Sequence, residues 1–328
     1  MKYRLLGKTG VQVSSLCFGT MSFGKEADEK MSIKMFNRCR EIGINCFDTA
    51  NVYSSGKSEE ILGKCIAHCR DEVIITSKVG NPTGKNMNAR GLSRRHIMMS
   101  IDESLKRLKT DRIDIYFVHK FDPLTEFDET LYALNELQRE GKILYLGVSN
   151  WAAWQIAKAL GISAKEGLAR FECIQPMYNL VKRQAEIELL PLAQNENMGV
   201  FTYSPLGGGL LTGKYRKGKK PKQGRILTDE KYKLRYRDNV YYEIAEKFLE
   251  YANNRGVHPV TLAVAWVMSH PSVTAPLIGA RNLEQLEPSL AAVEYIMDSK
   301  QRQEISDLSI TPPLATDRSE EAYYDKKI

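Results

Sequence analysis

The chain has 328 residues, of which 43% are hydrophobic and 27% are charged, the balance of a globular protein with a large buried core. Its apolar runs fall short of the roughly 20 residues that a membrane-spanning helix needs, and its first residues lack the long apolar stretch of a signal peptide. These features argue against an integral membrane protein, and they predict a cytoplasmic protein without a membrane partner.

Eight short runs rich in β-branched and aromatic residues recur along the chain, and each is a candidate strand. They cover residues 15–20, 45–50, 73–78, 113–119, 143–149, 173–178, 199–205 and 275–279. Stretches with apolar residues at helical spacing lie between them, among them residues 26–43, 93–109 and 128–142.

This alternation predicts the fold. Almost continuously apolar strands that alternate with helices are typical of a parallel sheet covered by helices. Eight such units predict a single (β/α)8 TIM barrel, an α/β fold, over residues 1–308. An open doubly wound sheet is the alternative, but no G-x-G-x-x-G motif follows the first strand. Residues 309–328 form a C-terminal tail whose prolines and charges leave its order open.

Two segments lie outside the regular alternation. Residues 3–14 place a Lys-Thr-Gly turn between short apolar runs, which predicts a β-hairpin that caps the bottom of the barrel. About 70 residues separate Ser204 from Ala275, so the loop after the seventh strand is long, as functional loops often are. Helical patterns near residues 238–255 and 259–269 fall within this loop.

The same loop carries the positive charge of the chain. Residues 214–225 hold seven basic residues and no acid, which equals the formal net charge of +7. A solvated loop and a site for a phosphate-bearing small ligand both fit this segment. A nucleic-acid surface is a remote alternative, because the segment has no aromatic interleaving and no recognised binding motif.

The cysteines predict neither a disulfide framework nor a metal site. Six of them lie scattered in apolar or helical contexts, which indicates reduced thiols. Cys65, His68 and Cys69 lie one helical turn apart and could share a metal ion. A zinc site normally needs four ligands, so we interpret these residues as an ordinary helix face.

Four chemically capable side chains follow the second, third and fourth strands. Asp48 closes the second strand, with Tyr53 just beyond it; Lys78 closes the third and His119 the fourth. The C-terminal ends of barrel strands share one mouth, where active sites of this fold lie. Singly, each has an ordinary explanation as a cap, a surface charge or a structural histidine. Together they predict a site for proton transfer.

The four residues have complementary roles in that chemistry. A tyrosine has a pKa of about 10, so it holds a proton at neutral pH but releases it reluctantly. The ammonium of Lys78 is expected to lower the pKa of Tyr53, at about 1.4 kcal/mol per pKa unit. Asp48 would hold Lys78 in place and keep it protonated. His119 would direct a donor at the oxygen on which charge develops.

The sequence resembles the aldo-keto reductase family from about residue 3 to residue 290. The resemblance is closest to the members related to potassium-channel β-subunits and their bacterial enzyme relatives. Signature segments occur in the family's order: "FGTMSFG", "FDTANVYSSGKSEEILGK", "ITSKVG", "IDIYFVHKFDP", "GKILYLGVSNW", "IQPMYN", "YSPLGGGLLTGKY" and "IGARNLEQL". The resemblance implies that Asp48, Tyr53, Lys78 and His119 form a catalytic tetrad with Tyr53 as general acid.

The resemblance also implies a binding site for NADPH. It places the nicotinamide carboxamide at Ser149, Asn150 and Gln175, and the nicotinamide ring against Tyr203. It implies that the pyrophosphate lies along Ser204, Leu206, Gly208 and Lys214, and that the reactive face lies beside Gly19, Thr20 and Met21. Gly279, Arg281 and Gln285 would line the adenosine end.

The match is incomplete beyond Gln285. A Glu-Asn pair that is frequent in the family is replaced by Pro288 and Ser289, which leaves adenine contacts from these two positions open. Arg281 suits a 2′-phosphate, because a guanidinium binds phosphate through two donors. On the predicted helix, Glu284 lies three residues from Arg281 and could pair with it instead.

Two functions follow, from different classes. The first is NADPH-dependent reduction of an aldehyde or ketone. The alternative is a cofactor-bound regulatory subunit of a channel or other complex, with slow turnover. The tetrad does not separate them, and the substrate and any homo-oligomer stay open. Trp151, Trp154 and Met21 could shape the substrate pocket, although Trp154 also fits a helix core.

Overall fold

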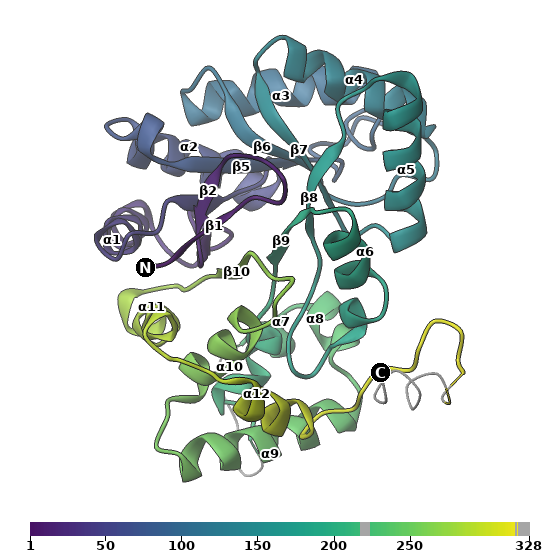
Figure 1. The fold of residues 1–328 in the computed structure, drawn as a ribbon. Coiled ribbons are helices and arrows are strands. Elements are labelled where there is room, and N and C mark those ends of the chain that lie inside the picture. The colour runs from purple at the N-terminus through teal and green to yellow at the C-terminus, as the bar shows by residue number, and fades with distance from the viewer. Residues whose placement is uncertain (217–223, 319, 321–328) are drawn as a thin grey trace.

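The structure is a computed structural model that describes residues 1–216, 224–318 and 320 (Figure 1). In these residues eight parallel strands close into a barrel in the order β10-β3-β4-β5-β6-β7-β8-β9. The strands are β3 (Cys17–Gly19), β4 (Cys46–Asp48), β5 (Ile74–Val79), β6 (Ile113–Val118), β7 (Ile143–Ser149), β8 (Phe171–Gln175), β9 (Gly199–Thr202) and β10 (Ala275–Ile278). This topology confirms the predicted (β/α)8 barrel.

Alternate residues of each strand serve two different cores. Cys17 and Cys46 belong to a small cluster inside the barrel, whereas their neighbours Phe18 and Phe47 belong to the large cluster between the barrel and the helices. Successive side chains of a strand point to opposite faces, so a strand buried on both faces is apolar throughout. All six cysteines are free thiols.

The N-terminal hairpin closes the bottom of the barrel, as predicted. Strands β1 (Tyr3–Leu5) and β2 (Gln12–Ser14) pair antiparallel, and Figure 1 shows them in front of the barrel opening. Leu6 and Val13 are fully buried in the cluster inside the barrel. The guanidinium of Arg4 donates to backbone carbonyls in the segment that leads into β10.

The principal helices surround the barrel. They are α1 (Glu29–Glu41), α2 (Lys57–Ile66), α3 (Arg94–Leu108), α4 (Phe127–Arg139), α5 (Ala153–Glu166), α6 (Leu189–Asn195), α9 (Asn239–Asn254), α10 (Pro259–Met268), α11 (Leu283–Leu290) and α12 (Ser299–Ser306). The helices predicted at 26–43, 93–109 and 128–142 are therefore confirmed as α1, α3 and α4. The side chain of Asp28 accepts a hydrogen bond from the amide of Met31, which explains why α1 begins later than predicted.

Shorter helical segments fill the connections. They are η1 (Tyr53–Gly56), η2 (Arg70–Glu72), η3 (Gln184–Glu186), η4 (Gly207–Thr212), α7 (Arg225–Thr228), α8 (Glu230–Arg235) and η5 (Ala291–Val293). No helix among the described residues is both long enough and apolar enough to cross a membrane.

The long connection between β9 and β10 holds η4, α7, α8, α9 and α10. Its two predicted helices are confirmed as α9 and α10, which Figure 1 shows on the side of the barrel away from α3 and α4. The sequence did not predict α7 and α8. Residues 217–223, the centre of the basic segment, lie outside the described residues.

Candidate active site

A buried ion pair lies at the C-terminal ends of β4 and β5. The Lys78 ammonium donates to both carboxylate oxygens of Asp48, over 2.7 and 2.6 Å, and to the carbonyl of Thr49 over 2.6 Å. Thr76 and Gln175 also donate to Asp48 Oδ1, over 2.7 and 2.9 Å. The carboxylate thus accepts from side chains of two other strands, β5 and β8, and its contact with Lys78 is the one that we predicted.

The carboxylate keeps Lys78 charged. Burial alone lowers the pKa of this ammonium, but the attraction of Asp48 and then of Tyr53 outweighs it, so the pKa lies above its ordinary value of 10.5. Both side chains are almost inaccessible to water, with 0% of Lys78 and 2% of Asp48 exposed. Buried charges are tolerated where they are paired and hydrogen-bonded in this way.

A strained turn places Tyr53 over this pair. Ser54, Ser55 and Gly56 all have left-handed backbone conformations, with φ of 49°, 54° and 91°. The hydroxyl of Ser54 donates to the carbonyl of Phe23 over 2.7 Å, which fixes the turn. A left-handed serine costs free energy, and such costs are commonly found at functional sites. The turn therefore returns the phenol to the mouth of the barrel, as the Ser-Ser-Gly sequence suggests.

The ring of Tyr53 meets both of its expected partners. Lys78 Nζ lies 5.1 Å from the centre of the ring, and the imidazole of His119 meets it edge-on with 6.0 Å between ring centres. The expected net lowering of the Tyr53 pKa is nevertheless wrong. Desolvation raises the pKa more than Lys78 lowers it, so the phenol stays firmly protonated at neutral pH.

His119 is a neutral imidazole. It follows β6, and its backbone amide donates to the carbonyl of Val79 over 2.8 Å. Burial first, then the charges of Lys78 and Lys120, lower its pKa to about 3. Its Nδ1 is enclosed and has no hydrogen-bond partner in the described residues. A neutral imidazole carries one N–H, so His119 can donate to a substrate oxygen without delivering a full positive charge.

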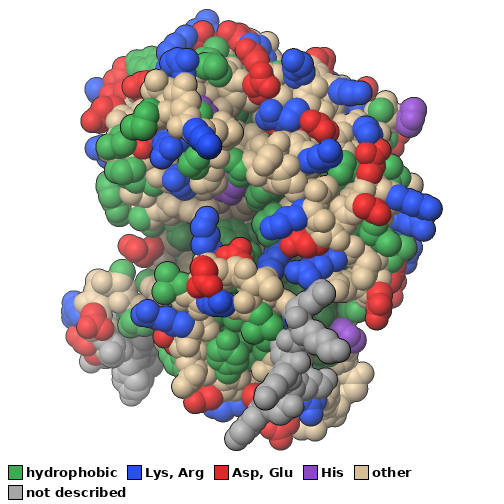
Figure 2. Space-filling model, turned by 180° about the vertical axis from the view of Figure 1, so that it is seen from behind, with side chains coloured by type: hydrophobic (Ala, Val, Ile, Leu, Met, Phe, Trp, Pro, Cys, Tyr) green, Lys and Arg blue, Asp and Glu red, His purple; other side chains and the backbone are tan. Residues whose placement is uncertain are grey.

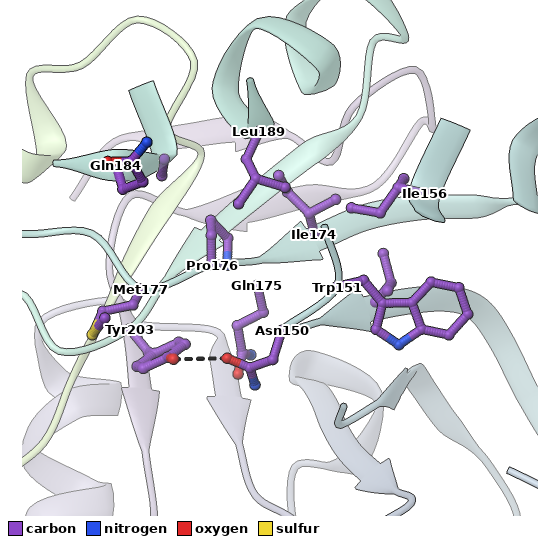
Figure 3. A pocket seen from close by; sticks show the side chains of 12 residues that line it. Asn150, Trp151, Ile156, Ile174, Gln175, Pro176, Met177, Gln184, Leu189 and Tyr203 are labelled. Atoms are coloured by element: carbon purple, nitrogen blue, oxygen red, sulfur yellow. Dashed lines mark hydrogen bonds between the residues drawn. The ribbon is translucent and has the colours of Figure 1, made fainter. Parts of the chain in front are cut away.

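Amide and phenol groups gather at the C-terminal ends of β7, β8 and β9, and Figure 3 shows Asn150, Gln175 and Tyr203 among them. The phenol of Tyr203 donates to Asn150 Oδ1 over 2.7 Å, and Asn150 Nδ2 donates to the hydroxyl of Ser149 over 2.9 Å. The Ser149 hydroxyl in turn donates to the carbonyl of Gln175 over 2.9 Å. The structure thus brings together the four residues that we predicted to hold the nicotinamide.

Asn150, Gln175 and Tyr203 form one wall of a cavity of about 230 Å³. The rest of the wall is mainly apolar, and Figure 3 shows Ile174 and Leu189 opposite Asn150 and Tyr203. Trp151 also lines this cavity, as expected of a pocket residue, but Met21 and Trp154 do not. Trp154 is 62% exposed, so the alternative that places it in a helix core is wrong.

The glycine-rich segment after Tyr203 forms the short helical segment η4. Gly207, Gly208 and Gly209 all have positive φ, between 56° and 98°. A Cβ atom added at Gly208 would come within 2.8 Å of the Tyr236 ring, so only glycine fits this position. Ser204 and Leu206 are half-buried next to these glycines. The amides of Gly207 and Gly209 donate to the carbonyls of Ser204 and Leu206 over 3.0 and 2.9 Å, and Gly208 is the one of the three glycines that is partly exposed.

Three cations gather near this segment. Burial first, then the neighbouring charges of Arg281 and Arg225, lower the pKa of Lys214. Lys214 and Arg281 were predicted individually, whereas Arg225 was predicted only as part of the basic segment. Figure 2 shows the face opposite the hairpin, where basic side chains surround a central hollow. Like charges held close together without equal countercharge favour an anionic ligand.

The remaining predicted cofactor residues lie at the C-terminal ends of β3 and β10. Gly279 packs closely against the carbonyl of Gly19, and Met21 is half-buried. Thr20 is buried, and its hydroxyl donates to the carbonyl of Asp48 over 3.1 Å. Thr20 therefore supports the tetrad through the backbone.

The adenosine end differs from expectation in its ion pair. The backbone amide of Arg281 donates to Gln285 Oε1 over 3.4 Å at the start of α11. Its guanidinium lies 3.8 Å from Glu26, so its acidic neighbour is Glu26 and not Glu284, which the sequence left as a possible partner. Glu284 points into solvent from the first turn of the helix. No pattern in the sequence points to Glu26, because only tertiary structure brings it to Arg281.

The two departures from the family pattern lie in α11. Ser289 is 1% exposed, so its side chain packs into the protein. The carbonyl of Pro288 accepts a hydrogen bond from Thr261 over 2.6 Å. Both positions therefore contribute to packing of α11 against α10. No group of three or more His, Cys, Asp or Glu side chains among the described residues is arranged to hold a metal ion.

Comparison with known proteins agrees with this geometry. The model of the aldo/keto reductase family matches residues 15–310, which include the whole barrel and the tetrad. The chain therefore belongs to the aldo/keto reductase family, a family of oxidoreductases. This finding confirms the resemblance that the motifs indicated.

Individual relatives fall into two kinds. The chain is 38% identical to the uncharacterized oxidoreductase YrpG of Bacillus subtilis, over 94% of this chain and 96% of that one. It is 37% identical to a probable voltage-gated potassium channel subunit beta of Arabidopsis thaliana, over 90% of this chain and 92% of that one. Norsolorinic acid reductase of Aspergillus flavus is 31% identical, over 93% of this chain and 80% of that one.

Proposed function

We propose that this protein reduces an aldehyde or ketone to the alcohol with NADPH as cofactor. The observation that carries the proposal is the buried Lys78–Asp48 pair beneath the ring of Tyr53, with neutral His119 at its edge. This arrangement offers a phenolic proton and a neutral hydrogen-bond donor at one point. Membership of the aldo/keto reductase family supports it.

The residues present fit NADPH. The cavity wall with its amide groups suits a carboxamide, the partly exposed Gly208 permits close approach of a pyrophosphate, and the nearby cations suit phosphate charge. Asn150, Gln175 and Tyr203 would hold the nicotinamide end, and Lys214 and Arg281 the phosphates. When bound, NADPH supplies the hydride that the carbonyl carbon accepts.

Each tetrad residue has a defined task. Tyr53 transfers its phenolic proton to the carbonyl oxygen, which becomes the alcohol oxygen, and recovers a proton from solvent afterwards. Lys78 stabilises the phenolate that this transfer leaves, and Asp48 keeps Lys78 in place. His119 donates a hydrogen bond to the same carbonyl oxygen and so orients it.

A panel of carbonyl compounds tests this function. Purified protein should oxidise NADPH in the presence of at least some aliphatic or aromatic aldehydes and ketones, and the product should be the corresponding alcohol. The loss of NADPH absorbance measures the rate, and chromatography identifies the product. Absence of both cofactor binding and turnover across the panel would contradict the proposal.

A regulatory subunit with slow turnover is the second candidate. The similarity to a probable potassium channel subunit beta over nine-tenths of the chain favours it. The two functions differ in rate and in partner. Steady turnover of a substrate by the isolated protein supports the enzyme, whereas single-turnover oxidation of bound NADPH with slow exchange supports the regulatory subunit.

Cofactor choice is a further prediction, and it concerns Arg281. The 2′-phosphate of NADPH is close to a dianion at neutral pH, and a guanidinium binds it through charge-assisted hydrogen bonds. We expect a preference for NADPH over NADH. Arg281→Ala should reduce that preference about 10- to 100-fold, which corresponds to roughly 1.5–3 kcal/mol. Dissociation constants of both cofactors measure it; equal weakening of both would remove Arg281 from this role.

A further inference from the structure

A tight turn holds Glu26 next to Arg281. The carbonyl of Ser22 accepts hydrogen bonds from the backbone amides of Lys25 and Ala27, over 3.2 and 3.0 Å. The hydroxyl of Ser22 donates to the carbonyl of Ala280 over 2.6 Å, which ties this turn to the residue before Arg281. The position of Glu26 relative to Arg281 is therefore built into the backbone.

The ion pair between them leaves the carboxylate only partly used. Glu26 Oε1 lies 3.8 Å from the nearest guanidinium nitrogen of Arg281, and Glu26 Oε2 is enclosed without a hydrogen-bond partner in the described residues. Glu287 makes a useful contrast, because Arg38 contacts its two oxygens over 2.7 and 3.1 Å. The carboxylate of Glu26 thus retains free acceptor capacity in a half-buried position.

Glu26 carries a negative charge next to Arg281, which belongs to a cluster of three cations. Arg281 and Arg225 lie close enough to Lys214 to lower its pKa. A dianionic phosphate attracted by these cations would meet the negative charge of Glu26 and would compete with it for Arg281. A bare ribose hydroxyl carries no such charge, and it could donate to the carboxylate of Glu26, which lies no closer than 3.8 Å to the guanidinium of Arg281.

We propose that Glu26 is a specificity-determining residue for the cofactor, which weakens binding of the 2′-phosphate of NADPH and accepts a hydrogen bond from the 2′-hydroxyl of NADH. This inference rests on the proposed function, since it assumes that Arg281 faces the adenosine end. With Glu26 in this role, the protein should prefer NADPH moderately and should use NADH measurably. Arg281 and Glu26 together, rather than Arg281 alone, set the ratio.

Glu26→Gln tests the proposal because it removes the charge and keeps the shape. We expect NADPH to bind about 2- to 5-fold more tightly, because Arg281 loses the surface ion pair with Glu26 that competes with the phosphate. NADH should bind more weakly, because its 2′-hydroxyl loses a charged acceptor. The ratio of the two dissociation constants should shift by about 10-fold towards NADPH. Titration of the full-length protein by calorimetry gives both constants without any turnover.

Glu284→Gln is the matched control. It makes the same chemical change three residues from Arg281 in the sequence, but Glu284 points into solvent and makes no ion pair with Arg281. The ratio for this variant should stay within about twofold of wild type. An equal shift in both variants would reduce the effect of Glu26 to general electrostatics and overturn the proposal, as would an unchanged ratio in Glu26→Gln.

A double-mutant cycle separates the specific contact from a structural role of the turn. In an Arg281→Ala background, Glu26→Gln should tighten NADPH less than it does in wild type, because competition for the guanidinium is gone and only the repulsion between Glu26 and the phosphate is left to relieve. Titration with 2′,5′-ADP and 5′-ADP should show the same pattern as the whole cofactors. If Glu26→Gln is poorly folded, Glu26→Ser provides the same loss of charge. Failure of wild type to bind NADPH or NADH defeats the proposed function itself, whereas normal binding with an unshifted ratio defeats only the role of Glu26.

Discussion

Replacing Tyr53 with Phe is expected to lower the rate of carbonyl reduction by at least about 100-fold, the typical contribution of a general acid. The ring would keep its contacts with Lys78 and His119, because both involve the aromatic face or edge. Only the proton donor is lost, so the dissociation constant of NADPH should change by less than about twofold. Steady-state kinetics and cofactor titration on the same preparation measure both effects.

Tyr116→Phe is a suitable control for the loss of a phenol hydroxyl. Tyr116 lies on β6 in the core between barrel and helices, and its hydroxyl has no partner in the described residues. Its removal should leave the reduction rate near that of wild type. Near-normal turnover by Tyr53→Phe would assign the proton transfer to another group.

Lys78→Met is expected to have the second large effect, on stability as well as on rate. It leaves Asp48 buried without its countercharge, and breaking a buried pair from one side costs about 3–5 kcal/mol. The phenolate of Tyr53 also loses the ammonium that stabilises it, so we expect reduction to fall at least about 100-fold. Denaturant unfolding and initial rates measure the two losses separately.

Two further variants give this experiment its controls. Lys64→Met breaks the exposed pair with Glu29, whose 2.8 Å contact is similar in length, and should cost less than about 1 kcal/mol. Asp48→Asn combined with Lys78→Met removes both buried charges and should recover part of the stability, but none of the activity. Equal costs for Lys64→Met and Lys78→Met would contradict the importance of burial.

The pH dependence of this stability follows from the raised pKa of Lys78. A group whose pKa is higher in the folded state than its ordinary value of 10.5 stabilises the fold fully below that value, and the contribution is lost as pH rises through the folded-state pKa. The difference in unfolding free energy between wild type and Lys78→Met should therefore be nearly constant across neutral pH. It should shrink only in strongly alkaline solution.

The barrel can be predicted from the sequence because one pattern, an apolar strand followed by a helix, recurs along the chain. Eight apolar runs with helices between them leave few topologies, and β6 illustrates why, since only Asp114 interrupts its buried residues. The helices α7 and α8 escaped prediction because each is one or two turns long. Their six or fewer residues give no helical period, and tertiary contacts such as that of Tyr236 with Gly208 hold them.

The chemistry of the site was predictable in part. Strand ends share a mouth, so Asp48, Lys78 and His119 could be expected to meet from their positions alone. The direction of the Tyr53 pKa could not, because sequence shows which charges are neighbours but not how much water the fold removes. Glu26 likewise lies 255 positions from Arg281, and the pairing of β3 with β10 and the hydrogen bond from Ser22 to Ala280 bring the two turns together.

The contacts of the N-terminal hairpin have a consequence for synthesis of the chain. Arg4 bonds to the carbonyl of Val273, and β3 pairs with β10 through Cys17 and Leu277. A ribosome that adds about 5–20 residues per second needs many seconds to deliver those partners. Until then the edge of β3 that pairs with β10 has no partner strand, and such exposed edges invite association with other chains. We therefore expect the barrel to close only after its last strand, β10, has emerged.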